Sequence, residues 1–184
     1  MTFITPKKGR LLIAEVSLTG DLSFNRAVVL LVEHNADGSM GFILNKELPF
    51  PLSDLLPDID KDFKVYKGGP VDQDKLFYVH KIPDRLPGSI EIDEGIFWGG
   101  DFEILHKALQ SGSINPREIK FFLGYSGWMP DQLDYEIKSE SWILFENKYD
   151  IITADSTSFW KEKLEELGGD YLIWANSPEN PNFN

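Results

Sequence analysis

The sequence lacks cysteine and has only three histidines in 184 residues. Without thiols the chain can form no disulfide, no thiolate metal site and no cysteine nucleophile, which excludes zinc-finger and thioredoxin-like proteins. The histidines, His34, His80 and His106, are far apart, and no two have the i, i+4 spacing that places two metal ligands on one helix face. We therefore expect no metal site.

Positive charge is also scarce. The chain has 18 Lys and Arg residues against 30 Asp and Glu residues, so its formal net charge is −12. A protein with this charge repels polyanions at physiological salt. The basic cluster of Lys7, Lys8 and Arg10 lies in a short polar arm at the N-terminus. Direct binding of nucleic acid is therefore disfavoured.

Long apolar runs are absent as well. No stretch approaches the roughly 18 apolar residues that a membrane span needs. The apolar run at 11–14 has neither the length nor the cleavage pattern of a signal peptide. We expect a cytoplasmic protein without membrane contact. The length predicts one domain over 1–184, with flexible tails at about 1–8 and 176–184.

Apolar periodicity and turn residues predict a mixed α+β domain with a mostly antiparallel, hairpin-rich sheet. The predicted strands are 9–16, two strands within 24–46, then 64–66, 75–82, 89–92, 96–98, 119–123, 142–145, 149–152 and 171–174. The predicted helices are Phe102–Gln110, capped by Asp101 and ended near Gly112, then Pro130–Lys138 and Ser158–Leu167, with one helical turn in Ser53–Leu56. Residues 48–62 are otherwise expected to be a connection.

The turn within 24–46 holds the densest group of potentially reactive side chains. These are Glu33, His34, Asn35 and Asp37, followed by the glycines Gly38 and Gly41. Neighbouring residues of a strand point to opposite faces, so Glu33 and His34 are not expected to act as a catalytic pair. Asn, Asp and Gly also stabilise turns, and this role competes with binding or catalysis as the reason for their presence.

The segment 124–128, Gly-Tyr-Ser-Gly-Trp, follows an apolar run as a hydrolase nucleophile elbow would. Trp128 stands where the elbow needs a second glycine, and all three histidines precede Ser126, which is the reverse of the order in that fold. A strand-to-helix turn with Trp128 packed beneath it is the favoured interpretation. Another fold could still assemble a triad, so serine hydrolysis stays open as an alternative.

Two further motifs fail as ligand sites. Asp58, Asp60 and Asp62 alternate as in a calcium loop, but Phe63 and Gly69 occupy positions where that loop needs glycine and a carboxylate. Gly68-Gly69-Pro70 could offer backbone amides to an anion, yet no helix starts there and no Walker or dinucleotide fingerprint occurs in the chain. A tight turn is expected at 68–70, and no cofactor is predicted.

Three blocks, taken in order, resemble the YqgE/AlgH family of bacterial proteins. They are Leu11–Ala14 leading to Phe24–Gly41 with Asn45, the turn Gly68–Val71, and Leu123–Trp128 with Gln132, Leu133 and Trp142. The resemblance covers nearly the whole chain. It implies a compact α+β fold in which a strongly curved, partly barrel-like sheet is surrounded by helices. It brings no catalytic residue set, and the family's link to transcriptional regulation of exopolysaccharide production need not involve DNA contact.

We expect a non-catalytic binding or regulatory protein that acts through a small molecule or a protein partner. Two rigidly presented polar turns form its candidate surface. The candidate residues are Glu33, His34, Asn35, Asp37, Gly38, Met40, Gly41, Asn45, Gly68, Gly69, Pro70, Gly124, Tyr125, Ser126, Gly127, Trp128 and Gln132. One alternative is a hydrolase-like enzyme using His34 with Glu33 or Ser126. Another is a DNA-binding regulator, which the net charge opposes.

Overall fold

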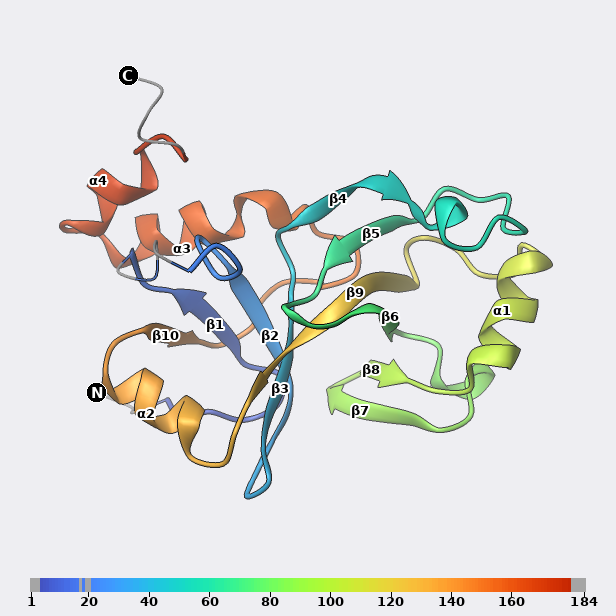
Figure 1. The fold of residues 1–184 in the computed structure, drawn as a ribbon, viewed down its shortest axis with the longest axis horizontal. Helices are drawn as coiled ribbons and strands as arrows, with labels where there is room; N and C mark the ends of the chain where they lie inside the picture. Colours follow the sequence, from blue (N-terminus) through green and yellow to red (C-terminus); the bar gives the residue numbers. More distant parts are fainter. Residues whose placement is uncertain (1–3, 17, 19–20, 180–184) are drawn as a thin grey trace.

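The computed structural model describes residues 4–16, 18 and 21–179. The expected flexible tails at 1–8 and 176–184 lie partly outside these residues. Within the described part, ten strands form one sheet, with helices packed around it (Figure 1). The mixed α+β fold predicted from the sequence is confirmed.

The elements follow one another in irregular order along the chain. The strands are β1 (Leu11–Ala14), β2 (Val28–Asn35), β3 (Gly38–Ile43), β4 (Glu47–Pro51), β5 (Lys64–Lys67), β6 (Val71–His80), β7 (Ser89–Asp93), β8 (Ile96–Gly99), β9 (Ile119–Trp128) and β10 (Trp142–Phe145). The helices are α1 (Phe102–Gln110), α2 (Gln132–Lys138), α3 (Phe159–Leu167) and α4 (Tyr171–Ala175), with 3-10 turns η2 (Leu52–Asp54), η3 (Pro83–Arg85) and η4 (Ser156–Ser158).

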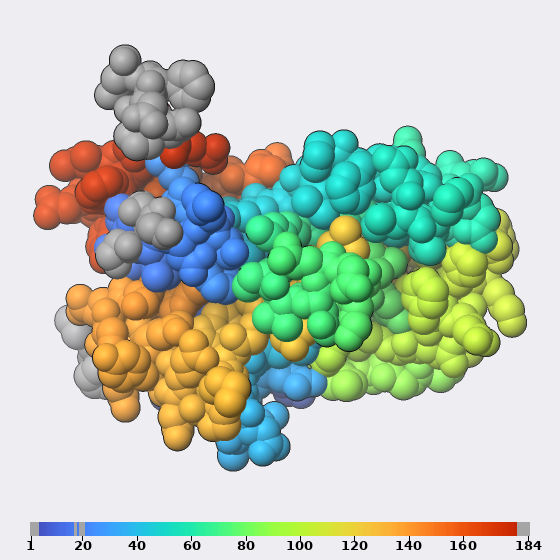
Figure 2. Space-filling view, in the orientation of Figure 1, coloured from blue at the N-terminus to red at the C-terminus, as the bar shows by residue number. Residues whose placement is uncertain are grey.

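The sheet is large, mostly antiparallel and not closed. Its main path runs β10-β1-β2-β3-β9-β6-β8-β7, and β5 joins β9 in parallel while carrying β4 on its other side. Strand β7, at one end of the path, lies against β2, so the sheet curls back toward itself. The tip of the β2–β3 hairpin projects from the body of the molecule (Figures 1 and 2).

Three clusters of apolar side chains pack the helices against the sheet. One fills the concave face of the curled sheet, with Phe42 stacked on Phe122 at a ring-centroid distance of 4.9 Å, and continues under α3. A second lies beneath α1, where Leu105 and Leu109 are buried. The third lies between the hairpin and α2. Helices α1, α2 and α3 therefore each cover a different part of the sheet with buried apolar side chains, and α4 packs mainly on α3.

Strand β9 is the central element. Its first half pairs with β5 on one side and β6 on the other, and its last residues pair with β3. The sequence predicts a strand only to Leu123, followed by a turn at 124–128. That prediction is wrong, because Gly124 takes a positive φ of 70° and lets the strand bend and continue to Trp128.

The remaining element predictions have mixed outcomes. Helix α1 has the predicted bounds, and the Asp101 carboxylate caps it by accepting the backbone N–H of Ile104 at 3.1 Å. Strand β4 was not predicted because it carries Pro49 and Pro51, which an edge strand tolerates. Helix α2 starts at Gln132 rather than Pro130, because Asp131 has a φ of 62°.

Two predicted strands near the C-terminus are wrong. Residues 149–152 form a turn, and buried Ile151 and Ile152 explain the apolar signal. Residues 171–174 belong to α4, in which Tyr171 and Ala175 pack on the core one helical turn apart. A short apolar run does not distinguish a strand from a buried helical turn by periodicity.

Candidate functional site

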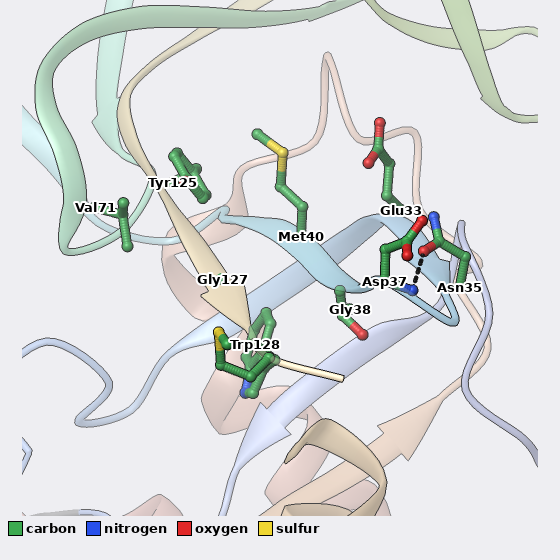
Figure 3. A pocket seen from close by; sticks show the side chains of 11 residues that line it. Glu33, Asn35, Asp37, Gly38, Met40, Val71, Tyr125, Gly127 and Trp128 are labelled. Carbon is green, nitrogen blue, oxygen red and sulfur yellow. Dashed lines mark hydrogen bonds between the residues drawn. The ribbon is translucent and has the colours of Figure 1, made fainter. Parts of the chain in front are cut away.

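A groove of about 510 Å³ lies where the tip of the β2–β3 hairpin meets the end of β9 (Figure 3). Both polar turns singled out in the sequence contribute to it. Its lining residues are Glu33, Asn35, Asp37, Gly38, Ser39, Met40, Val71, Tyr125, Gly127, Trp128 and Met129. The volume falls within the roughly 300–1,000 Å³ of small-molecule sites.

The hairpin presents its side chains in a fixed order. Ala36 and Asp37 form a two-residue turn, and the Asn35 side-chain oxygen accepts the backbone N–H of Asp37 at 2.8 Å. Glu33 lies opposite Met40 in the ladder, so both are on the groove face. In Figure 3, Met40 stands between Tyr125 on one side and Glu33 with Asp37 on the other.

Strand β9 forms the floor of the groove. Gly127 pairs with Met40 and is exposed, and Tyr125 lies two residues away on the same face. The Tyr125 ring packs edge-on with Phe77 at a centroid distance of 5.6 Å. A Cβ on Gly127 would lie 3.1 Å from Cε2 of Tyr125. The glycine therefore leaves the space beside the tyrosine ring open.

Two carboxylates line the groove without a partner of their own. Among the described residues, the side chains of Glu33 and Asp37 form no hydrogen bond and no ion pair. Some cationic side chains elsewhere do pair with acidic ones, as Lys81 does with Asp150 at 2.6 Å. The groove thus combines an apolar floor with an unneutralised acidic wall.

His34 lies outside the groove. It pairs with Ser39 across the hairpin, and its Nδ1 is 2.8 Å from the Ser39 hydroxyl oxygen. The prediction that Glu33 and His34 point to opposite faces is confirmed by this register. Ser126 is fully buried and donates its hydroxyl hydrogen to the Gly68 carbonyl at 3.1 Å. His34 and Ser126 are thus engaged with different partners, and among the described residues no hydrogen bond joins His34 to Ser126 or to Glu33.

The other candidate residues outside the groove stabilise the backbone around it. Asn45 accepts the N–H of Val28 and donates to the carbonyl of Arg26, both at 2.8 Å. Gln132 accepts the N–H of Met129 at 2.8 Å, which fixes the exit from β9. The tight-packing positions are Gly41, Gly68, Gly69 and Gly124, where a Cβ would meet backbone or buried side-chain atoms at under 3.0 Å. Pro70 follows Gly69 directly and precedes the first residue of β6.

Sequence reasoning missed three lining residues, namely Ser39, Val71 and Met129. Val71 reaches the groove because β6 begins there and pairs with Tyr125. That pairing joins segments 54 positions apart, and no local pattern encodes it. Met129 is 73% exposed, and the only local signal was its position next to the predicted turn.

A buried cation lies away from the groove. Lys120, 5% exposed, donates to the Ser156 hydroxyl oxygen at 3.1 Å, and its Nζ lies 4.1 Å from the centroid of the Tyr66 ring. Burial lowers the pKa of Lys120 to about 8, and the charge of Asp155 opposes this shift only in part. Ser156 is fully buried as well, so this pair holds η4 to the sheet.

Lys120 should make stability depend on pH. An unfolded lysine has a pKa of about 10.4, so between pH 8 and 10 the unfolded state binds more protons than the folded state. The free energy of unfolding should therefore rise with pH in this window, by about 2 kcal/mol between pH 7.5 and 9.5. Urea unfolding of the wild type and Lys120→Met measures this rise. A rise of the same size in Lys120→Met would contradict the assignment.

The described residues contain no helix long and apolar enough to cross a bilayer. They also contain no group of three or more His, Asp or Glu side chains arranged to hold a metal ion.

The sequence pattern of the AlgH-like family (DUF179) matches residues 11–172. The chain belongs to the AlgH-like family. A UPF0301 protein from Bacteroides thetaiotaomicron is 41% identical, and the match covers 98% of this chain and 93% of the relative. One from Cytophaga hutchinsonii is also 41% identical, with 96% and 98% covered. The family assigned from three sequence blocks is thus confirmed.

Two solved structures show the AlgH-like fold in more distant proteins. The solution structure of the AlgH protein from Pseudomonas aeruginosa has a TM-score of 0.71 at 24% identity, covering 97% of this chain and 98% of that one. A crystal structure from Corynebacterium diphtheriae has a TM-score of 0.75 at 18% identity, covering 96% and 95%. At these identities the likeness shows a common fold and nothing more.

Proposed function

We propose that this AlgH-like protein is a non-catalytic binding protein that engages its ligand or partner through the groove between the hairpin tip and the end of β9. The observation that carries the proposal is the groove itself, in which an apolar floor meets two carboxylates that no described residue neutralises. Unpaired charge beside exposed apolar surface is a feature that a bound partner stabilises.

The chemistry of the lining residues favours binding over catalysis. The hydroxyl of Ser39 interacts with His34, and Ser126 is sealed in the sheet. A nucleophile must be accessible and must lie beside a base that is oriented by a third group. Ser126 is not accessible, and Ser39 lies beside His34 but lacks Glu33 as a third group, because Glu33 lies on the opposite face of the hairpin.

Filling the floor of the groove should abolish binding. Gly127 has an ordinary backbone conformation, so Gly127→Val adds a side chain beside Tyr125 without torsional strain. Proteins and small molecules retained from an extract of the source cells are quantified by mass spectrometry for the wild type and this variant. We expect the specifically retained species to fall at least tenfold.

Glu91→Val is the control, because it places the same side chain on an exposed strand position of β7 outside the groove. Urea unfolding verifies that both variants are folded. Retention that is equal in Gly127→Val and wild type, with both proteins folded, would refute the proposed function.

A further inference from the structure

We infer that the groove receives a lysine or arginine side chain carried by an extended segment of a protein partner. This inference rests on the proposed function and specifies its partner. Its basis is the juxtaposition of the Glu33 and Asp37 carboxylates with the Tyr125 ring, Met40 and an unpaired backbone edge of β9.

The charges select a cation. Glu33 lies in β2 and Asp37 in the hairpin turn, and neither has a cationic neighbour within ion-pair distance among the described residues. The net charge of −12 adds a field that favours positively charged partners. A basic group placed between these carboxylates would donate charge-assisted hydrogen bonds to their oxygens.

The floor suits the apolar part of the same side chain. Lysine and arginine bury their aliphatic stems along apolar surface and keep the charged head near polar groups. Met40 provides flexible apolar surface, and the Tyr125 ring provides a π face that attracts a cation. Figure 3 shows Met40 between the Tyr125 ring and the acidic wall, so a basic side chain whose head reaches the carboxylates runs its stem along Met40 toward the ring.

The backbone beside the groove favours a polypeptide over a free amine. Pairing between β6 and β9 ends at Tyr125, whereas β9 continues for three residues, which pair with β3 alone in the described part of the chain. One edge of Gly127 and Trp128 therefore has no strand partner, whereas Ser126 is buried and its backbone N lies against Gly69. An extended peptide can add a strand at such an edge, and a free amine cannot use it.

The test is an NMR titration of the ¹⁵N-labelled full chain with a synthetic peptide, acetyl-Ser-Val-Thr-Arg-Thr-Val-Ser-amide. We expect amide shifts at 33–41 and 125–129. Replacing the arginine by citrulline, which is neutral and nearly isosteric, should weaken binding at least tenfold. Argininamide alone should bind at least tenfold more weakly than the peptide, because it lacks a backbone to pair.

The double variant Glu33→Gln, Asp37→Asn should bind the arginine peptide at least tenfold more weakly than wild type. Asp60→Asn, Glu165→Gln removes the same two charges outside the groove and should stay within twofold. Equal affinity for arginine and citrulline peptides would overturn the inference, as would argininamide binding as tightly as the peptide, or shifts confined to other surfaces.

The two proposals can fail separately. If Gly127→Val loses the species retained from extract while Glu33→Gln, Asp37→Asn keeps it, the groove binds a partner that is not cationic. The inference then fails and the proposed function stands. If both variants retain it as wild type does, both proposals fail.

Discussion

Replacing Gly69 by alanine should destabilise the protein by about 3 kcal/mol or more, because overpacking against a rigid backbone exceeds the usual cost of 1–3 kcal/mol. The added Cβ would lie at under 3.0 Å from the backbone C and O of Tyr125 and the N of Ser126. These are backbone atoms of the central strand, so no side chain can rotate away to relieve the overlap. Urea unfolding measures the loss.

Gly127→Ala is the matched control for Gly69→Ala. It makes the same glycine-to-alanine change in β9, close to where Gly69 packs, but its Cβ meets only the edge of the Tyr125 ring at 3.1 Å. We expect its free energy of unfolding to stay within about 1 kcal/mol of wild type. A Gly69→Ala protein as stable as Gly127→Ala would show that β9 and the 68–70 turn do not cross as closely as described.

Removing the Glu136 carboxylate should have the second largest effect. Its Oε2 accepts the indole N–H groups of Trp128 at 2.8 Å and Trp142 at 2.9 Å, and Oε1 accepts the side-chain amide of Gln132 at 2.9 Å. Both tryptophans are buried, at 6% and 2% exposure. Glu136→Ala leaves two buried donors without an acceptor, so we expect a loss of about 2–4 kcal/mol in urea unfolding.

Glu136→Gln tests the cause of this loss. Glutamine keeps one oxygen for the indole groups but loses the charge, so it should cost about 1 kcal/mol. A Glu136→Ala protein within about 0.5 kcal/mol of wild type would mean that water satisfies both indoles, and that α2 is not held to the end of β9 by this carboxylate.

Local chemistry was sufficient to predict the hairpin and α1. Asp101 can cap only a helix that starts at Phe102, and the Asn-Ala-Asp-Gly cluster specifies a two-residue turn. The same reasoning failed at α4 and at 124–128. In both, the outcome depends on what the segment packs against, which is α3 for the first and β3 for the second.

The candidate surface was predicted in part for a similar reason. Residue type identified Glu33, Asp37, Met40 and Tyr125, which the structure brings into one groove. It could not separate them from Ser126 or Asn45, whose polar groups are used inside the fold. Strand alternation distinguishes the residues that face the groove from those that face the interior only after the register of β3 against β9 is known.

We propose that the groove is where this protein meets its partner. The most direct measurement is an NMR spectrum of the ¹⁵N-labelled protein in an unlabelled extract of the source cells, compared with buffer. We expect the amide signals of Glu33, Asp37, Met40 and Gly127 to shift or broaden, and to return to their buffer positions in Gly127→Val. Unchanged groove signals, or a response confined to another surface, would contradict the claim.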